Sequence, residues 1–402
     1  MSFDDNNFYN NGNFFNNSDK NDQTFDSYVE EVKENSDNND LEQSNIDSDN
    51  NNNVAFRPIK IRIIGIGGGG NNAVSRIAEQ ASLFPTVELY AANTDQQVLK
   101  VLEQKYKNIN IIPLGGERTR GLGAGSNPEI GKEATLLSKD AIVNVIKGAD
   151  LVFIAAGMGG GTGTGGAPVI AQICKENGVP CIGIVTYPFN SEGDKKFSQA
   201  KKGIDNLREY VDILSIVYNQ KALDNYKSIP YNEVVIKADL ILLETIKAIT
   251  DVILNYTTIN VDFADLVTVI KDKKTAHIAQ GYAKGKNRLA RALQMAGENT
   301  LLGTSIRNST NIIVNILYDK RLPAGDVDDA LPQIKEVAAK NVNIISGYGL
   351  DPKLEDEVYV TIIATGFEDN QLNEENESNN ENTNIINNEE VDLNSFLSRL
   401  KK

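Results

Sequence analysis

Two glycine-rich segments of this sequence are of a kind that binds phosphate groups. The first covers residues 65–70 and reads Gly-Ile-Gly-Gly-Gly-Gly, and the second covers 157–166 and reads Gly-Met-Gly-Gly-Gly-Thr-Gly-Thr-Gly-Gly. Each follows an apolar run that predicts a strand and precedes a pattern that predicts a helix. Glycine allows backbone N–H groups to approach a phosphate, and the N-terminus of a helix favours an anion. Two such loops in one sheet therefore predict a single nucleotide held between them.

The two segments differ in how specific they are. The first satisfies the G-x-G-x-x-G pattern, which also occurs in NAD-dependent oxidoreductases, and a tight turn without a ligand would use the same glycines. In the second, each glycine costs roughly 0.5–1 kcal/mol relative to alanine, so a flexible hinge explains so many of them poorly. We interpret it as a nest of backbone amides around a polyphosphate, with the hydroxyls of Thr162 and Thr164 as further donors. An oxidoreductase would leave this second segment without a role, and the absence of G-x-x-x-x-G-K-[ST] excludes a P-loop.

Apolar runs alternate with helical patterns through the first half of the chain. The near-continuous apolar run at 150–156 is typical of a strand that is buried on both faces of a parallel sheet. The alternation therefore predicts an open, Rossmann-like α/β sheet whose ligand loops follow the carboxyl ends of the strands. The predicted strands are 59–64, 87–92, 150–156 and 180–186, and the predicted helices between them include 127–147 and 166–177.

The pattern then changes to a long central helix followed by a second block. The helix is predicted over 231–256, because its apolar residues are spaced three and four apart. These residues are Val234, Val235, Ala238, Ile241, Leu242 and Thr245. The second block is predicted to be a smaller α+β domain, with a helix at 284–302 and strands at 311–318, 341–347 and 357–365. The predicted divisions of the body are 57–230 for the nucleotide-binding domain, 231–256 for the helix and 257–367 for the second domain.

The net charge of −15 comes mainly from two polar tails. Residues 1–56 carry 13 acidic and 2 basic side chains, and residues 368–402 carry 9 acidic and 3 basic side chains. Because 1–56 and 368–390 are rich in polar residues and poor in apolar ones, both segments are predicted to be disordered. The body between the tails is close to neutral, which gives no electrostatic reason to expect a nucleic-acid partner.

Cysteine and histidine usage excludes several kinds of site. Cys174 and Cys181 do not have the spacing of a redox pair or a zinc knuckle, and two thiols make no disulfide framework. The single histidine, His277, removes most histidine-based metal sites and Ser-His-Asp triads, and we expect it to be a packed or surface residue. The sequence has no run of about 18 apolar residues and does not begin like a signal peptide. We therefore expect a cytoplasmic protein in a reducing compartment.

Residues 160–165, Gly-Gly-Thr-Gly-Thr-Gly, resemble the signature of the tubulin/FtsZ family of GTPases. Further motifs that resemble the family's loops occur in the family's order and extend over almost all of 57–367. They are 65–70, Ala92-Asn93-Thr94-Asp95, 121–128, 188–193 and Asn260-Val261-Asp262-Phe263-Ala264-Asp265. The resemblance implies a GTP-dependent protein that forms head-to-tail homopolymers in cell division.

The resemblance also implies roles for individual residues of the nucleotide site. Glu192 would accept hydrogen bonds from the ribose hydroxyls, and Asn219 and Asp239 would recognise guanine. Lys196 stands where the family usually has an arginine at the γ-phosphate, and lysine keeps the charge but lacks the planar fork. Val235 replaces a phenylalanine that stacks on guanine in many members, so a non-hydrolysing relative is an alternative. The implied GTP-binding residues are Gly67, Gly68, Gly69, Gly70, Asn71, Asn93, Gly123, Ala124, Gly157, Gly159, Gly160, Gly161, Thr162, Gly163, Thr164, Gly165, Glu192, Lys196, Asn219 and Asp239.

Asn260, Asp262 and Asp265 are implied to be the catalytic residues. In the family, this loop lies at the far end of the monomer from the nucleotide, and head-to-tail association brings it to a neighbour's γ-phosphate. A carboxylate can orient an attacking water, and phosphoryl transfer depends mostly on positioning and charge stabilisation. Without the family context, the two aspartates would read as charges at a helix N-terminus. Mg²⁺ is expected as the counter-ion of the phosphates, and the sequence identifies no ligands for it.

The last residues of the chain, 391–402, carry an apolar stripe behind the acidic tether 368–390. The stripe has the spacing of one helix face, and so short a helix is marginal alone and should fold on a partner. The resemblance implies that the partners are membrane-tethering and regulatory division proteins, at the division site on the inner face of the membrane. A frayed tail is the alternative. The stripe consists of Leu393, Phe396, Leu397 and Leu400.

Overall fold

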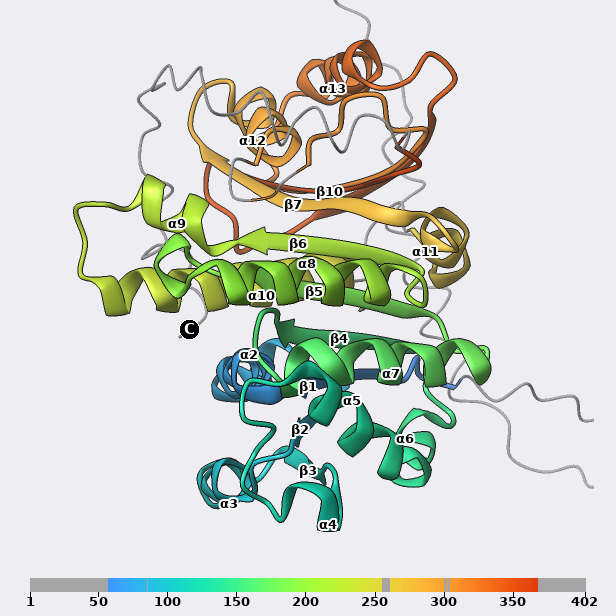
Figure 1. Cartoon of the computed structure of the whole chain (residues 1–402). Helices are drawn as coiled ribbons and strands as arrows, with labels where there is room; N and C mark the ends of the chain where they lie inside the picture. Colours follow the sequence, from blue (N-terminus) through green and yellow to red (C-terminus); the bar gives the residue numbers. More distant parts are fainter. Residues whose placement is uncertain (1–56, 85, 255–260, 300–301, 303, 368–402) are drawn as a thin grey trace, which may run out of the picture. The chain divides into compact units, whose positions relative to one another are not determined.

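The computed structural model describes residues 57–84, 86–254, 261–299, 302 and 304–367. The strands within these residues are β1 (Ile61–Ile66), β2 (Val87–Asn93), β3 (Ile109–Pro113), β4 (Leu151–Gly157), β5 (Cys181–Tyr187), β6 (Ile213–Tyr218), β7 (Lys274–Lys284), β8 (Asn311–Tyr318), β9 (Asn343–Leu350) and β10 (Glu357–Thr365). They form one ten-stranded sheet in the order β3-β2-β1-β4-β5-β6-β7-β10-β8-β9 (Figure 1). The predicted tails, with the partner-binding stripe, lie outside the described residues.

The first six strands are all parallel, as predicted for an open α/β sheet. Six of the seven residues of β4 are buried, because helices cover both faces of this part of the sheet. The predicted strands correspond to β1, β2, β4 and β5, with bounds that differ by one or two residues. β3 and β6 are additional strands. Asn110 and Pro113 interrupt the apolar pattern of β3, which explains why the sequence does not predict it.

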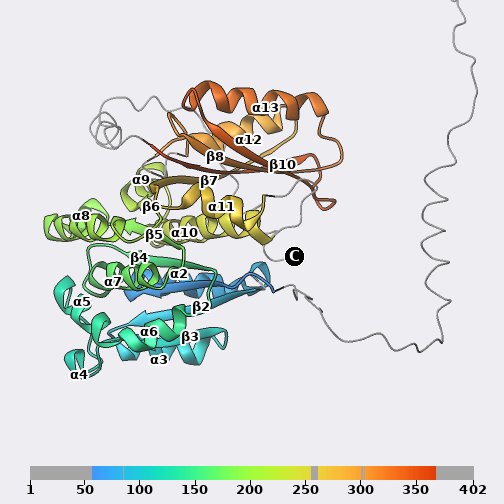
Figure 2. The same ribbon diagram turned by 90° about the vertical axis from the view of Figure 1, so that its right-hand side faces the viewer.

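Two layers of helices cover this parallel half. The helices are α2 (Gly67–Glu79), α3 (Gln96–Lys105), α4 (Gly116–Thr119), α5 (Pro128–Leu137), α6 (Lys139–Ile146), α7 (Thr162–Glu176), α8 (Asp194–Arg208) and α9 (Asn219–Asn225), followed by α10 (Tyr231–Leu254). One hydrophobic cluster joins α2, α3 and α10 to one face, and a second joins α6, α7 and α8 to the other (Figure 2).

The prediction of one helix over 127–147 is wrong. The chain instead forms α5 and α6, which meet at Ser138. The backbone N–H of Ser138 bonds to the carbonyl of Thr135 at 3.1 Å, which ends α5. The Ser138 hydroxyl also accepts a hydrogen bond from the backbone N–H of Gly115 at 3.1 Å. These bonds hold the turn between the two helices, and no apolar pattern signals them.

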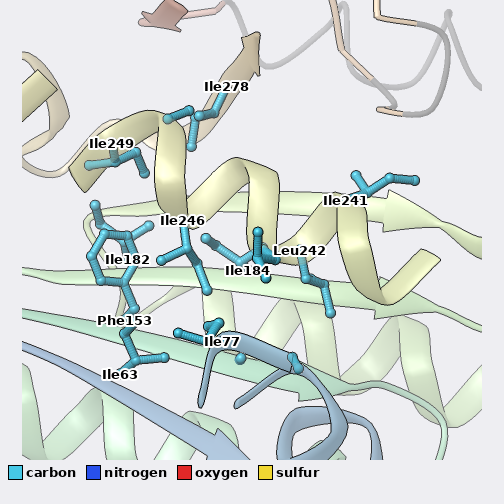
Figure 3. Packing of buried hydrophobic residues seen from close by; sticks show 14 of the residues in the cluster. Ile63, Ile77, Phe153, Ile182, Ile184, Ile241, Leu242, Ile246, Ile249 and Ile278 are labelled. Carbon is cyan, nitrogen blue, oxygen red and sulfur yellow. The ribbon is translucent and has the colours of Figure 1, made fainter. Parts of the chain in front are cut away.

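The predicted central helix is α10, and it packs against both halves of the sheet. Figure 3 shows Leu242 and Ile246 directed toward strand residues such as Ile184 of β5. The same cluster includes Ile278 of β7, which belongs to the second half. Apolar burial of this kind contributes roughly 1.5–3 kcal/mol per fully buried side chain.

The second half of the sheet is mixed. β7 and β8 pair antiparallel to β10, and β9 pairs parallel to β8. The two halves join through only two residue pairs between β6 and β7, namely Ile213 with Lys274 and Leu214 with Thr275. The helices of this half are α11 (Phe263–Ile270), α12 (Arg288–Gly297) and α13 (Ala324–Val337). Both α12 and α13 pack on a third hydrophobic cluster.

The predictions for this half are partly correct. β8 and β10 have the predicted bounds, and β9 begins and ends later than the predicted strand 341–347. The helix predicted over 284–302 is wrong at both ends. Lys284 still belongs to β7, Asn287, with a φ of 52°, precedes the helix, and the helix ends at Gly297. The sequence does not predict β7, in which polar residues interrupt the apolar pattern, or α13, which contains Pro332.

His277 is a fully buried residue of β7, in agreement with a packed role. Its Nε2 lies 2.7 Å from the carbonyl of Ala296, and its Nδ1 lies 2.9 Å from the carbonyl of Thr304. Burial lowers the pKa of this imidazole, while the two carbonyl contacts raise it in part. The histidine therefore ties β7 to the end of α12.

Two carboxyl groups outside the candidate site have strongly shifted pKa values. Burial raises the pKa of Glu244 on α10 to about 7. Asp319 is also buried, and burial alone would raise its pKa. Hydrogen bonds from Arg321, the Asp356 backbone and Arg288 instead lower the pKa of Asp319 to about 2. Within the described part of the chain, no helix is both long and apolar enough to cross a membrane.

Candidate nucleotide site

The two glycine-rich segments lie in contact at the carboxyl ends of two neighbouring strands. The first begins α2 directly after β1, and the second connects β4 to α7. A Cβ atom built on Gly67 would lie 2.9 Å from the backbone N of Gly163. One built on Gly69 would lie 3.0 Å from the Cα of Gly157. The two loops thus border one common surface, which is the arrangement that the sequence predicts for one nucleotide between them.

Asn71 and Asn93 hold the first loop to the end of β2. Both side chains are buried. With its side-chain amide oriented so that both atoms have partners, Asn71 has its nitrogen within hydrogen-bond distance of three carbonyls, those of Gly65 at 2.9 Å, Gly67 at 3.0 Å and Ala92 at 3.2 Å. Its amide oxygen accepts from the Nδ2 of Asn93 at 3.0 Å. The sequence predicts that the two amides bind the nucleotide; the contacts present here are within the protein and position the loops.

A third loop, 121–127, closes on the second glycine-rich segment. The hydroxyls of Thr94 and Thr162 lie 2.6 Å apart, which links the end of β2 to the start of α7. The backbone N–H of Gly123 donates to the carbonyl of Thr94 at 3.1 Å. Ala124 is buried, and its Cβ would lie 2.8 Å from a Cβ built on Gly161. All four predicted phosphate-side motifs therefore meet at one place.

Several glycines of these loops have a packing role, so the phosphate nest predicted from the sequence is not the only reason for so many glycines. A Cβ on Gly70 would lie 2.1 Å from the carbonyl oxygen of Ala155 on β4. A Cβ on Gly165 would lie 1.9 Å from the carbonyl oxygen of Pro128 at the start of α5. Such approaches are possible only for glycine, because real Cβ contacts are longer. These glycines let helices pack closely on the sheet and on each other.

Gly68 and Gly160 are different, because a Cβ on either would meet no atom within 4 Å. Neither has a positive φ, so neither the backbone conformation nor the packing requires glycine there. Open space next to backbone N–H groups is what a phosphate would occupy. The Thr164 hydroxyl is already used inside the loop, where it accepts from the N–H of Gly159 at 2.9 Å.

Glu192 and Lys196 form a pair beside the second loop. The Oε2 of Glu192 lies 2.7 Å from the Nζ of Lys196, and its Oε1 accepts from the backbone N–H of Phe189 at 2.9 Å. A Cβ on Gly159 would lie 3.0 Å from the backbone carbonyl oxygen of Lys196, so the pair is adjacent to the glycines. The carboxylate retains lone pairs that can accept hydrogen bonds from hydroxyls.

Asn219, the first residue of α9, carries an acceptor without a partner. Its Oδ1 is buried and makes no hydrogen bond with any described residue. A buried unsatisfied acceptor costs about 1–3 kcal/mol, so such an atom points to a missing donor. The ring N–H and amino groups of guanine are donors of this kind, and the residue therefore fits the role that the sequence predicts.

Asp239 on α10 is bound to a residue that the sequence analysis did not identify. Its Oδ2 lies 3.1 Å from the Nε of Arg76 on α2. Burial raises the pKa of Asp239, and the neighbouring guanidinium opposes this shift. Val235, on the same helix, is partly buried against the hydrophobic core. No local pattern could have identified Arg76, because it comes from a helix 163 positions away in the chain.

Asp262 and Asp265 lie at the start of α11 and bond to each other's backbone. The Asp265 N–H donates to the Oδ1 of Asp262 at 2.7 Å, and the Asp262 N–H donates to the Oδ2 of Asp265 at 3.4 Å. This arrangement is a capping box, so the two aspartates form a charge cluster at the N-terminus of α11. Asn260, the third expected catalytic residue, lies outside the described residues.

Asp262 and Asp265, which we call the acid pair, begin α11, and α11 lies at the opposite end of the sheet from the glycine loops (Figure 1). α11 leads into the start of β7, which pairs with the start of β6, whereas the glycine loops follow the carboxyl ends of β1 and β4. The helix α10, with 24 residues, runs between the two ends and is roughly 36 Å long. Within one copy, Asp262 and Asp265 therefore do not contribute to the site at the glycine loops.

Two family models match the sequence over most of the described body. Residues 60–227 match the model described as "Tubulin/FtsZ family, GTPase domain". Residues 274–368 match the model described as "FtsZ family, C-terminal domain".

Solved structures give the same result. An FtsZ dimer from M. jannaschii is 33% identical to this chain, with a TM-score of 0.69 over 77% of this chain and 89% of that chain. CetZ1 from Haloferax volcanii, a GDP-bound monomer, is 19% identical, with a TM-score of 0.67 over 79% of this chain and 98% of that chain. CetZ2 from Haloferax volcanii, a GTPgS-bound protofilament, is 17% identical, with a TM-score of 0.64 and the same coverage. The CetZ likeness concerns the fold alone.

Proposed function

This chain belongs to the tubulin/FtsZ family and is a GTPase, and we propose that it hydrolyses GTP at the contact between two copies joined head to tail. The observation that carries the proposal is the separation of the glycine loops from the acid pair by the length of α10. Within one copy, the glycine loops are at one end of the sheet, and Asp262 and Asp265 are at the other. A heterologous contact that joins unlike ends would bring them together, and its repetition would build a filament.

The proposed site divides the chemistry between the two copies. In one copy, the open backbone at Gly68 and Gly160 receives the phosphates, and Asn219 binds guanine. In the next copy, Asp262 and Asp265 keep their outer carboxylate lone pairs for a water molecule in line with the γ-phosphate. Orientation of that water and stabilisation of charge are the main requirements of phosphoryl transfer.

Magnesium would accompany the triphosphate, not occupy a cage of protein ligands. In the described part of the chain, no group of three or more His, Cys, Asp or Glu side chains is arranged to hold a metal ion. Mg²⁺ usually keeps several waters and binds through phosphates and one or two carboxylates. When bound, it would neutralise charge on the phosphate oxygens.

The division of the body follows from the same proposal. Residues 57–230 bind GTP, the helix 231–256 spaces the two ends, and residues 257–367 carry the acid pair. We further propose a cytoplasmic protein that forms a ring at the division site. Its 391–402 segment would recruit membrane-tethering and regulatory division proteins. The FtsZ structure is a dimer and the CetZ2 structure is a protofilament, which supports the self-assembly proposed for this chain.

The first test is the GTPase rate as a function of protein concentration, with light scattering measured in parallel. If the site is shared, the rate per molecule rises with concentration and the rise coincides with scattering. A rate per molecule that does not change on dilution would contradict a shared site.

The second test mixes two inactive variants. Asp265→Asn keeps the backbone cap, because an asparagine oxygen can also accept from the Asp262 N–H, but it removes the charge. Gly160→Asp places a carboxylate where a phosphate would bind. The mixture should recover part of the activity, since the intact loops of the first variant meet the intact acids of the second. A mixture of Asp265→Asn with Asp262→Asn is the control and should stay inactive. No recovery in the first mixture would place the whole site within one copy.

A further inference from the structure

β9 is an outer strand of the sheet whose free edge lacks the usual protection. Natural edge strands are kept from pairing by charges, proline, bulges or short length. β3, at the other edge, has only five residues and ends at Pro113. β9 has eight residues, reads Asn-Ile-Ile-Ser-Gly-Tyr-Gly-Leu, and contains neither a charge nor a proline. Among the described residues, none pairs with its outer side.

The backbone of β9 offers a regular row of donors and acceptors at this edge. The N–H groups of Asn343 and Asp351 point inward, to the carbonyls of Thr310 at 2.9 Å and Tyr318 at 3.0 Å. Backbone N–H and C=O groups of successive residues point to alternate edges of a strand, so those of the even-numbered residues point outward, to the free edge. These residues are Ile344, Ser346, Tyr348 and Leu350.

The chain leaves the described structure close to this edge. β10 ends at Thr365, which pairs with Asn311 at the start of β8, and Asn311 pairs with Asn343 at the start of β9. The tail therefore begins about 10 Å, two strand spacings, from the free edge. After Gly366, with a φ of 77°, Phe367 packs on the same hydrophobic cluster as two side chains of β9. The chain thus turns toward the α12 and α13 face of β8 and β9.

The tail contains the short sequence with which β8 and β9 begin. Residues 310–313 read Thr-Asn-Ile-Ile, residues 343–345 read Asn-Ile-Ile, and residues 383–386 again read Thr-Asn-Ile-Ile. The first two already pair in parallel register, asparagine with asparagine and isoleucine with isoleucine.

We propose that residues 384–387 of the tail add to the free edge of β9 as a short parallel strand of the same chain. Asn384 would lie opposite Asn343 and extend the row of asparagine side chains, an arrangement that stabilises stacked strands. Ile385 and Ile386 would cover the two half-buried isoleucines of β9, one on each face of the sheet.

The connection and the charge permit this pairing. The 16 residues of 368–383 span up to roughly 50 Å when extended, far more than the distance to be crossed. The acidic residues of the tail lie in this linker and after 388, whereas 384–388 is uncharged, like β9 itself. Docking would shorten the free tether of 391–402 and hold that segment near the second half of the sheet.

The test is hydrogen exchange of the full chain in GDP, at a concentration where it does not assemble. Ile386→Pro removes an N–H that would bond to the Ile344 carbonyl in this register, and Leu372→Pro, in the linker, is the matched control. With an effective concentration on the order of millimolar and a dissociation constant of about 0.1 mM, exchange in 343–350 should be about ten-fold faster in Ile386→Pro than in the parent. Leu372→Pro should exchange like the parent.

Three outcomes would overturn the proposal. Equal exchange in all three proteins would mean that the tail does not cover β9. Equal acceleration by both substitutions would mean that the sequence 384–387 has no special role. Protection that disappears on dilution would assign the edge to a second copy of the chain. GTP turnover plays no part in this test, so it is independent of the proposed shared site.

Discussion

The glycines of the two loops should separate into two classes when each is replaced by alanine. Gly165→Ala puts a methyl group 1.9 Å from the Pro128 carbonyl oxygen, and Gly70→Ala puts one 2.1 Å from the Ala155 carbonyl oxygen. Both obstacles are backbone atoms inside packed elements, which cannot rotate away. Overpacking of this kind costs typically 1–3 kcal/mol and occasionally more, so both variants should unfold at lower denaturant concentration.

Gly160→Ala and Gly68→Ala should have the opposite effect. Neither methyl group meets an atom within 4 Å, and neither position has a positive φ. The free energy of unfolding without nucleotide should therefore stay the same or rise by about 0.4–1 kcal/mol. GTP affinity should fall, because the methyl group occupies the space of a phosphate oxygen. Loss of one hydrogen bond to a charged group, about 1.5–3 kcal/mol, corresponds to roughly 10- to 100-fold weaker binding.

Two measurements on the same four variants decide the matter. Urea unfolding in the absence of nucleotide gives the free energy of unfolding, and titration with a fluorescent GTP analogue gives the affinity. The reasoning is refuted if Gly160→Ala and Gly68→Ala bind GTP as tightly as the parent, or if Gly165→Ala and Gly70→Ala are as stable as the parent. Either result would mean that the space around these glycines does not determine their role.

Three further predictions concern single side chains. Asp319→Asn should lower the free energy of unfolding at pH 7 by about 1.5–3 kcal/mol, because the buried guanidinium of Arg288 loses one of its two carboxylate partners and keeps only Asp356. Since the folded pKa of Asp319 is about 2, the difference from the parent in urea unfolding should shrink as the pH falls toward that value. Glu244→Gln should be more stable than the parent at pH 8, on the order of 1–3 kcal/mol, and equally stable near pH 4. The reason is that the folded pKa of about 7 lies above the ordinary value of 4.5 for a glutamate, so the folded state is penalised only when the carboxyl ionises. Equal thermal stability at pH 8 would contradict this. Asn219→Ala should leave the free energy of unfolding without nucleotide unchanged or raise it, because it removes a buried acceptor that has no partner, but it should weaken GTP binding about ten-fold. Undiminished preference for GTP over ATP in competition assays would count against its contact with guanine.

The features that could be predicted from the sequence are those with a strong local pattern. The continuous apolar run of β4 predicts burial on both faces of the strand, and the three-and-four spacing of apolar residues in α10 predicts one buried helix face. The glycine loops are predictable because few ordered structures need so many glycines after a strand. β7 could not be predicted, since its burial depends on β10, which lies about 80 positions later in the chain.

The finer organisation of the site depends on partners that are distant in sequence. The contact of Asp239 with Arg76 and that of Asn71 with Asn93 have no local signal. The sequence also has no local signal that distinguishes glycines in close contact with a backbone carbonyl from glycines next to open space. Only the packing of α5 and α7 on the sheet shows to which of these two kinds a given glycine belongs.

The placement of unlike groups at the two ends of the sheet also has a consequence for growth. A filament made by joining such ends has a direction, because one tip displays glycine loops and the other displays the acid pair. If the site is shared as proposed, addition of a copy at one tip would complete a site on the filament, whereas addition at the other tip would complete a site on the added copy. The two tips would therefore lengthen at different speeds, and a small protein that fits one of them would stop growth there without affecting the other.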